Sequence, residues 1–78
     1  MTAERFSHQL ARSRWGEPDD WSGSVNDPRT QEENGIRFNE KWIYHQADGA
    51  RRIVYWFRYD FRGAVREAVD GTVTEETV

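Results

Sequence analysis

The stretch IRFNEKWIYHQADGARRIVYWFRYDFR, residues 36–62, decides the fold. Eight of the eleven aromatic residues of the chain lie in it. Asp48-Gly49 stands near its middle, and this dipeptide is typical of a two-residue turn in which both central residues have positive φ. The flanking segments are rich in aromatic and β-branched residues, which favour strands. The stretch therefore predicts an antiparallel β-hairpin over residues 36–62.

A two-residue turn at Asp48-Gly49 also predicts the register of this hairpin, with Trp42 opposite Tyr55. One face would then carry most of the large apolar side chains, including Phe38, Tyr44 and Tyr59. The other face would carry Trp56 surrounded by bases. The bases predicted on that face are Arg37, Lys41, Arg52, Arg58 and Arg62. We call this predicted surface the basic face, and in it Lys41 lies over an exposed Trp56 ring.

The segment before the hairpin divides into a helix and a loop. Residues 2–14 predict a short helix with Thr2 as N-cap, Glu4 in the first turn and Phe6 and Leu10 on one face. Two large apolar side chains are too few to stabilise an isolated helix of this length. We therefore expect the helix to pack on the sheet. Residues 15–35 contain many turn-forming residues and a net charge of −5, which predicts a long acidic loop.

Residues 63–78 leave two alternatives open: a further strand, or one or two helical turns, in either case with an acidic tail. Asp70-Gly71 is a second turn signal of the same type, and it would place Val69 opposite Thr72. The 78 residues together predict one small α+β domain. We expect a helix packed on an antiparallel meander of three or four strands.

Motifs for catalysis, cofactors and metals are missing from the sequence. The chain has no cysteine, and its two histidines, His8 and His45, lie on different predicted elements without zinc-type spacing. No glycine-flanked serine or phosphate-binding loop is present. The first residues lack a signal-peptide pattern, and no apolar run is long enough to span a membrane. We therefore expect a cytoplasmic protein that is not an enzyme and has no cofactor, metal or membrane contact.

The charge pattern bears on function, because residues 36–62 carry a net +3 between acidic segments that total −8. Trp, Tyr and Arg are the residues most enriched at interaction hot spots. The sequence thus predicts a small non-catalytic partner-binding protein, a regulator or inhibitor of a larger protein. The residues predicted to bind the partner are Trp56, Arg58, Lys41, Arg37, Arg52, Arg62 and Trp21.

Other interpretations of the basic face remain open. Bases around an exposed ring are also how some sheets hold single-stranded nucleic acid, which is the alternative function. A net charge of −3 and a pI near 5.3 disfavour it. The arginine and lysine stems can instead simply cover the solvent side of the sheet, or an acidic segment can fold over the face and neutralise it. Open strand edges further allow a homodimer.

Overall fold

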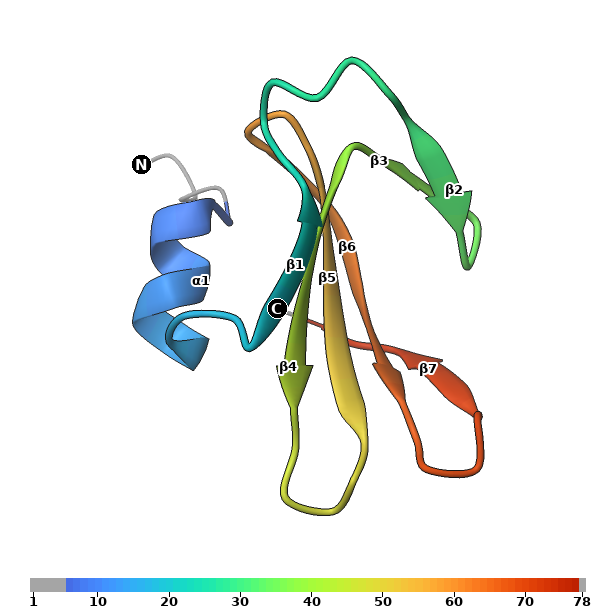
Figure 1. Ribbon diagram of the computed structural model, residues 1–78. Helices are drawn as coiled ribbons and strands as arrows, with labels where there is room; N and C mark the ends of the chain where they lie inside the picture. The colour runs from blue at the N-terminus through green and yellow to red at the C-terminus, as the bar shows by residue number, and fades with distance from the viewer. Residues whose placement is uncertain (1–5, 78) are drawn as a thin grey trace.

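The structure, a computed structural model, describes residues 6–77. These residues form one helix and seven strands (Figure 1). The elements are α1 (His8–Trp15), β1 (Asp20–Gly23), β2 (Gln31–Glu33), β3 (Ile36–Phe38), β4 (Glu40–His45), β5 (Arg51–Phe57), β6 (Asp60–Glu67) and β7 (Val73–Glu75). Five strands make an antiparallel sheet in the order β1-β4-β5-β6-β7, while β2 and β3 form a separate pair. The predicted α+β class is confirmed, but the predicted strand number is wrong.

The helix begins later than predicted, because Ser7 is its N-cap. The Ser7 hydroxyl accepts a hydrogen bond from the Leu10 N–H at 3.2 Å, which satisfies one of the free donors of the first turn. Gly16 ends the helix with a φ of 81°. The predicted cap Thr2 and the acidic Glu4 lie outside the described residues.

The predicted acidic loop over residues 15–35 is wrong, because this segment contains two strands. β1 pairs with β4 and places Trp21 opposite Trp42. β2 and β3 form a hairpin whose two turn residues, Asn34 and Gly35, have φ values of 55° and 76°. Positive φ at both positions is the geometry of the primed turn that the sequence predicted at residues 48–49.

The hairpin of β4 and β5 forms as predicted, but its register is shifted by one residue. Trp42 lies opposite Val54, and Tyr55 lies opposite Lys41. Because side chains alternate between the faces of a strand, this shift moves the residues of β5 to the faces opposite to those predicted. The large rings are therefore shared between both faces of the sheet.

The register differs because the turn contains three residues instead of two. The Gln46 N–H donates to the Ala50 carbonyl at 2.8 Å, which leaves residues 47–49 in the loop. Gly49 has a φ of 85°, whereas Asp48 keeps a negative φ and accepts the Ala50 N–H at 3.0 Å. A three-residue loop that ends in a left-handed glycine is the next most common hairpin connection.

The β6–β7 hairpin repeats this loop at the second Asp-Gly pair. Ala68 donates to the Thr72 carbonyl at 2.8 Å, and Asp70 accepts the Thr72 N–H at 2.9 Å. The predicted pairing of Val69 with Thr72 is therefore wrong for the same reason. Of the two alternatives for residues 63–78, the strand is the correct one.

The predicted second strand of the hairpin folds back on itself at residues 58–59. Phe57 lies opposite Asp60, so the chain enters β6 there instead of continuing straight to residue 62. The register of β5 and β6 then shifts between Tyr55, which faces Gly63, and Trp56, which faces Phe61. This shift is a β-bulge with Arg62 as the extra residue.

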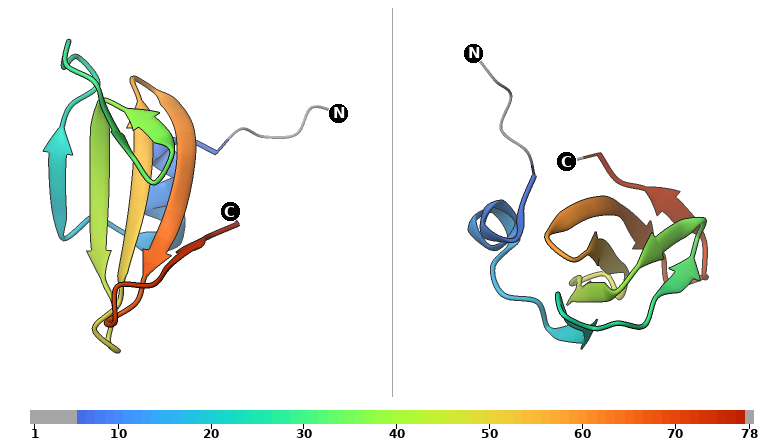
Figure 2. Two further views of the ribbon diagram at one scale, coloured as in Figure 1. Left: turned by 90° about the vertical axis from the view of Figure 1, so that its right-hand side faces the viewer. Right: turned by 90° about the horizontal axis from the view of Figure 1, so that it is seen from above.

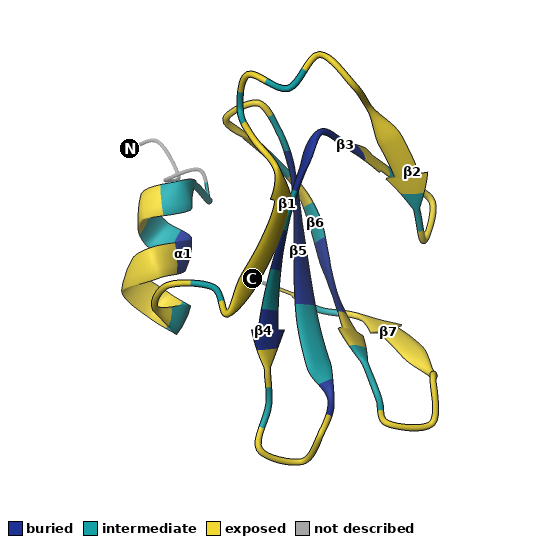
Figure 3. Ribbon diagram, in the orientation of Figure 1, coloured by how far each residue is buried: buried dark blue, intermediate teal, exposed yellow. Residues whose placement is uncertain are grey.

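The five-stranded sheet is covered on both sides. Figure 2 shows α1 on one side and the β2–β3 hairpin on the other. The core on the helix side is built from Ala11, Trp42, Tyr44, Val54, Trp56 and Ala64. The core on the hairpin side is built from Phe38, Ile53, Tyr55 and Val65. Figure 3 shows the resulting contrast between the buried middle strands and the exposed β1, β2 and β7.

Asn39 joins three segments where β3 passes into β4. Its side-chain oxygen accepts the Arg58 N–H at 2.8 Å, and its side-chain N–H groups donate to the carbonyls of Val25 and Asp27. The backbone of Gly23 packs so closely here that an added Cβ would lie 2.1 Å from the Asn39 carbonyl oxygen. A side chain at position 23 is therefore excluded by the backbone itself.

Candidate partner-binding surface

Trp56, the predicted centre of the basic face, is completely buried. Its exposed fraction is 0%, and its ring stacks on the His8 ring with centroids 4.0 Å apart. The register shift explains the difference, because it puts Trp56 on the same face as Trp42, under α1. The expectation of an exposed Trp56 ring is therefore wrong.

A buried carboxylate fixes the start of α1 above this ring. One oxygen of Glu40 lies 2.8 Å from Nε2 of His8, and the other accepts the Trp42 indole N–H at 2.9 Å. Glu40 is only 8% exposed, and a buried charge needs such partners. Nothing in the sequence pattern indicates this contact, because it joins residues 32 positions apart. The arrangement holds the helix on the sheet.

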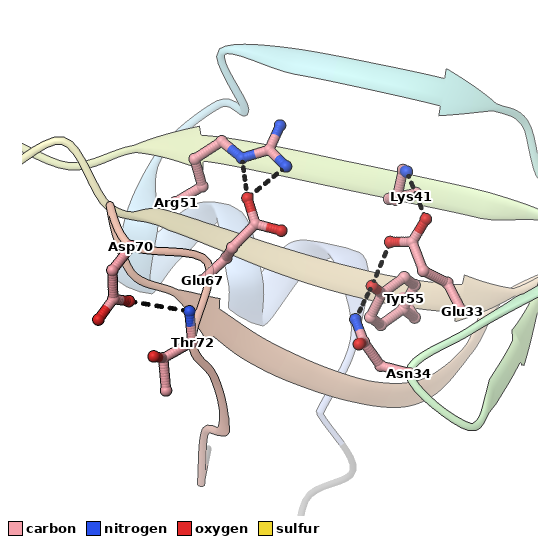
Figure 4. A network of polar contacts seen from close by, with 8 residues as sticks. All are labelled: Glu33, Asn34, Lys41, Arg51, Tyr55, Glu67, Asp70 and Thr72. Carbon is pink, nitrogen blue, oxygen red and sulfur yellow. Dashed lines mark hydrogen bonds and ion pairs between the residues drawn. The ribbon is translucent and has the colours of Figure 1, made fainter.

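Lys41 belongs to a network on the hairpin side of the sheet, shown in Figure 4. Its ammonium lies 3.3 Å from Glu33, whose other oxygen accepts the Tyr55 hydroxyl at 2.6 Å. Asn34 in turn donates to the Tyr55 oxygen at 3.0 Å. Burial raises the pKa of Glu33, but the Tyr55 hydrogen bond and the Lys41 charge outweigh it and leave the pKa below its usual 4.5.

We expect this network to make stability depend on acid pH. Because the pKa of Glu33 is lower in the folded than in the unfolded chain, its stabilisation is complete above pH 4.5 and is lost as the pH falls through the lowered value. Tyr55→Phe removes the main hydrogen bond to Glu33 and should cost about 1.5–3 kcal/mol at pH 7. Urea unfolding at pH 7 and pH 3 should show a smaller cost at pH 3. An equal cost at both pH values would contradict the role given to Glu33.

Arg52 is neutralised by the acidic tail. Its guanidinium pairs with Glu76 at 3.1 Å and lies over the Trp15 ring at 4.5 Å from the centroid. Lys41 is neutralised in the same way by Glu33 of the predicted loop. Acidic segments therefore neutralise both residues, but on opposite faces of the sheet, because Lys41 lies opposite Tyr55 and Arg52 lies opposite Tyr44.

Arg37, Arg58 and Arg62 remain together at one end of the sheet. Arg37 and Arg62 line a hollow of about 190 Å³ with the half-buried Phe57. The guanidinium carbon of Arg58 lies 6.0 Å from the centroid of the Phe57 ring. Two of the predicted basic residues thus line one hollow and a third lies near its ring, but that ring is Phe57 instead of Trp56.

Trp21 is the predicted aromatic residue that the structure leaves in solvent. It is 67% exposed on β1, an edge strand in which all four residues are exposed. It lies opposite Trp42 and on the same face as α1. The two indoles border a hollow of about 180 Å³, whose lining residues are Arg12, Glu17, Pro18, Trp21, Glu40 and Trp42. We call Trp21, β1 and this hollow the β1 surface.

Within residues 6–77, no group of three or more His, Cys, Asp and Glu side chains gathers to hold a metal ion. The same part of the chain has no helix that is both long and apolar enough to cross a membrane. The cytoplasmic location stays a prediction.

Comparisons with models of known families, with curated proteins and with solved structures all find no match. Function must therefore be argued from these surfaces.

Proposed function

We propose that this chain is a small non-catalytic protein that binds a protein partner at the β1 surface. The observation that carries the proposal is the 67% exposure of Trp21 on an edge strand. The other three tryptophans of the chain are buried or half-buried. Exposing a large indole to water is unfavourable, and tryptophan is among the residues most enriched at hot spots. Coverage of Trp21 by a partner would remove this cost.

The β1 edge supports the same proposal. β1 pairs with β4 on one side, and no strand within residues 6–77 pairs with its other side. Such an edge can receive an extended segment of a partner as an additional strand, with alternate side chains in neighbouring pockets. The hollow between Trp21 and Trp42 is the pocket next to this edge.

The charges around β1 favour a basic segment in that place. Glu17, Asp19 and Asp20 lie within four residues at the start of the strand, and because only Glu17 pairs with an arginine, Arg12, the described residues there keep a net negative charge. Like charges would oppose the approach of a second copy by its own β1, so a different protein is the better partner than a homodimer. The alternative function, single-stranded nucleic-acid binding, depends on Trp56 as a stacking ring, and α1 covers that ring.

Trp21→Ala should weaken the partner complex by about 2 kcal/mol or more while it leaves the fold unchanged. The tagged wild-type chain and the variant would be incubated with nuclease-treated lysate of the source organism, and the retained proteins identified by mass spectrometry. A partner should be retained by the wild type and lost from the variant. Val73→Ala, a change on the opposite edge strand β7, is the control and should retain the partner.

Two results would count against the proposal. The first is retention of the same proteins by the wild type and by Trp21→Ala. The second is loss of all bound material after nuclease treatment, which would favour nucleic acid as the ligand.

Sedimentation of the purified chain up to about millimolar concentration would separately report on a homodimer, since self-association would raise the measured molecular mass as the concentration rises.

A further inference from the structure

Most arginine and lysine side chains of residues 6–77 pair with a carboxylate, and most of the others lie close together. Of the ten arginine and lysine side chains within residues 6–77, six form an ion pair with a carboxylate. Arg14 lies over the Phe6 ring at 5.2 Å. Of the remaining three, Arg37 and Arg62 line one hollow with Phe57, and Arg58 lies 6.0 Å from the centroid of the same ring. The acids outnumber the bases in this chain, so three neighbouring arginines that pair with no carboxylate of residues 6–77 are unexpected.

Three different segments bring these arginines together. Arg37 comes from β3, Arg58 from the turn after β5, and Arg62 from β6. Arg62 is the extra residue of the β-bulge, so it is displaced from the regular ladder. Arg58 has a φ of 58°, a conformation that arginine adopts rarely, and the Asn39 side chain holds its N–H at 2.8 Å. The bulge thus places Arg62 at the hollow, and the turn places Arg58 near the Phe57 ring that lines it.

We infer that this arginine cluster binds a phosphate group that is joined to a flat ring. Guanidinium groups bind phosphate oxygens through pairs of charge-assisted hydrogen bonds, and three of them can surround a dianion. The hollow of about 190 Å³ has the Phe57 ring as its apolar wall, against which the ring of the ligand can pack. The site shares no lining residue with the β1 surface, so it is independent of the proposed function.

Two carboxylates lie near the cluster and affect its ligand preference. Glu32 stands directly opposite Arg37 in the β2–β3 register, and Asp60 stands opposite Phe57. Glu32 is exposed and forms no ion pair with Arg37 within the described residues. It would repel a bound phosphate, so Glu32→Gln should tighten binding.

Phenyl phosphate is the probe that contains both features of the ligand. In a titration followed by the amide spectrum of the ¹⁵N-labelled protein, we expect shifts at Arg37, Phe57, Arg58 and Arg62. Inorganic phosphate should bind at the same residues but several-fold more weakly, because it lacks the ring. Arg62→Gln should weaken phenyl phosphate by roughly tenfold, the effect of one lost charge-assisted hydrogen bond.

Arg66→Gln is the matched control, because it removes the same charge from the same strand. Arg66 pairs with Asp48 at the other end of β6, so its loss should leave the affinity for phenyl phosphate unchanged. The proposal is overturned if no shifts occur at about 10 mM phenyl phosphate, or if the two variants weaken binding equally. The amide spectrum of each variant shows directly whether it has folded.

Oligo-dT distinguishes the two sources of such a ligand. Much tighter binding of oligo-dT than of phenyl phosphate, at the same residues, would assign the site to single-stranded nucleic acid. Comparable binding of the two would assign it to a free phosphate ester. Binding of oligo-dT at other residues, without phenyl phosphate binding at the cluster, would overturn the proposal.

Arg58→Gly separates a binding role from a structural one. Glycine relieves the positive φ at this position, so the variant should unfold at a higher temperature than the wild type. It should also bind phenyl phosphate more weakly, because one guanidinium is lost. Higher stability with unchanged affinity would show that Arg58 is not part of the site.

Discussion

Trp56→Ala is expected to destabilise the protein by about 3–5 kcal/mol, the range for removal of a large aromatic side chain from a core. The ring is fully buried and contacts the rings of Phe6, His8, Trp42 and Phe61. A chain of this size has a total stability of about 4–12 kcal/mol, so the variant should lose a large share of it. Urea denaturation followed by circular dichroism measures the loss.

Trp21→Ala is the control for this prediction, because it makes the same chemical change at a residue that is 67% exposed. It should alter the free energy of unfolding by no more than about 0.5 kcal/mol. Similar losses for the two variants would contradict the placement of Trp56 under α1. So would a Trp56→Ala protein that remains as stable as the wild type.

Gly23→Ala is expected to cost about 2–4 kcal/mol, although it adds a single methyl group. Two effects contribute. Gly23 has a φ of 77°, which costs an alanine roughly 1 kcal/mol, and its Cβ would lie 2.1 Å from the Asn39 carbonyl oxygen. The clash is with backbone, which cannot rotate away, so it adds about 1–3 kcal/mol by displacing β1 from β4.

Gly16→Ala measures the cost of the positive φ alone, so the difference between the two variants gives the cost of the clash. Gly16 has a nearly equal φ of 81°, but an added Cβ meets no atom within 4 Å. Its cost should therefore be only about 1 kcal/mol. Thermal unfolding of the two variants side by side tests the difference, and equal midpoints would mean that the close approach at Asn39 is not rigid.

The sequence predicted the hairpin but not its register, and the reason lies in the turn dipeptides. Asp48-Gly49 and Asn34-Gly35 are equivalent signals for a primed two-residue turn. Only Asn34-Gly35 forms that turn, because at residues 48–49 the aspartate side chain caps a three-residue loop instead. Residues 31–33 have no apolar alternation, so nothing in the sequence indicated a strand before Asn34.

The candidate sites were predictable in part. Charge and spacing placed Arg37, Arg58 and Arg62 on a common surface, and the structure brings them together. It does so through a turn and a bulge, which hydrophobic alternation does not reveal. The burial of Trp56 could not be predicted from the sequence, because it depends on a one-residue difference in register. The exposure of Trp21 depends in turn on β1, which lay inside a segment predicted to be a loop.

The order of strands in the sheet has a consequence for how the chain folds. β4, β5, β6 and β7 are joined by successive short turns, so each pairing closes a small loop and loses little chain entropy. α1 and β1 reach the same sheet across more than 20 residues, as the Trp21–Trp42 pairing and the His8–Glu40 contact show. We therefore expect the C-terminal meander to nucleate first. The Trp56 ring would then stay in water until the N-terminal third of the chain docks over it.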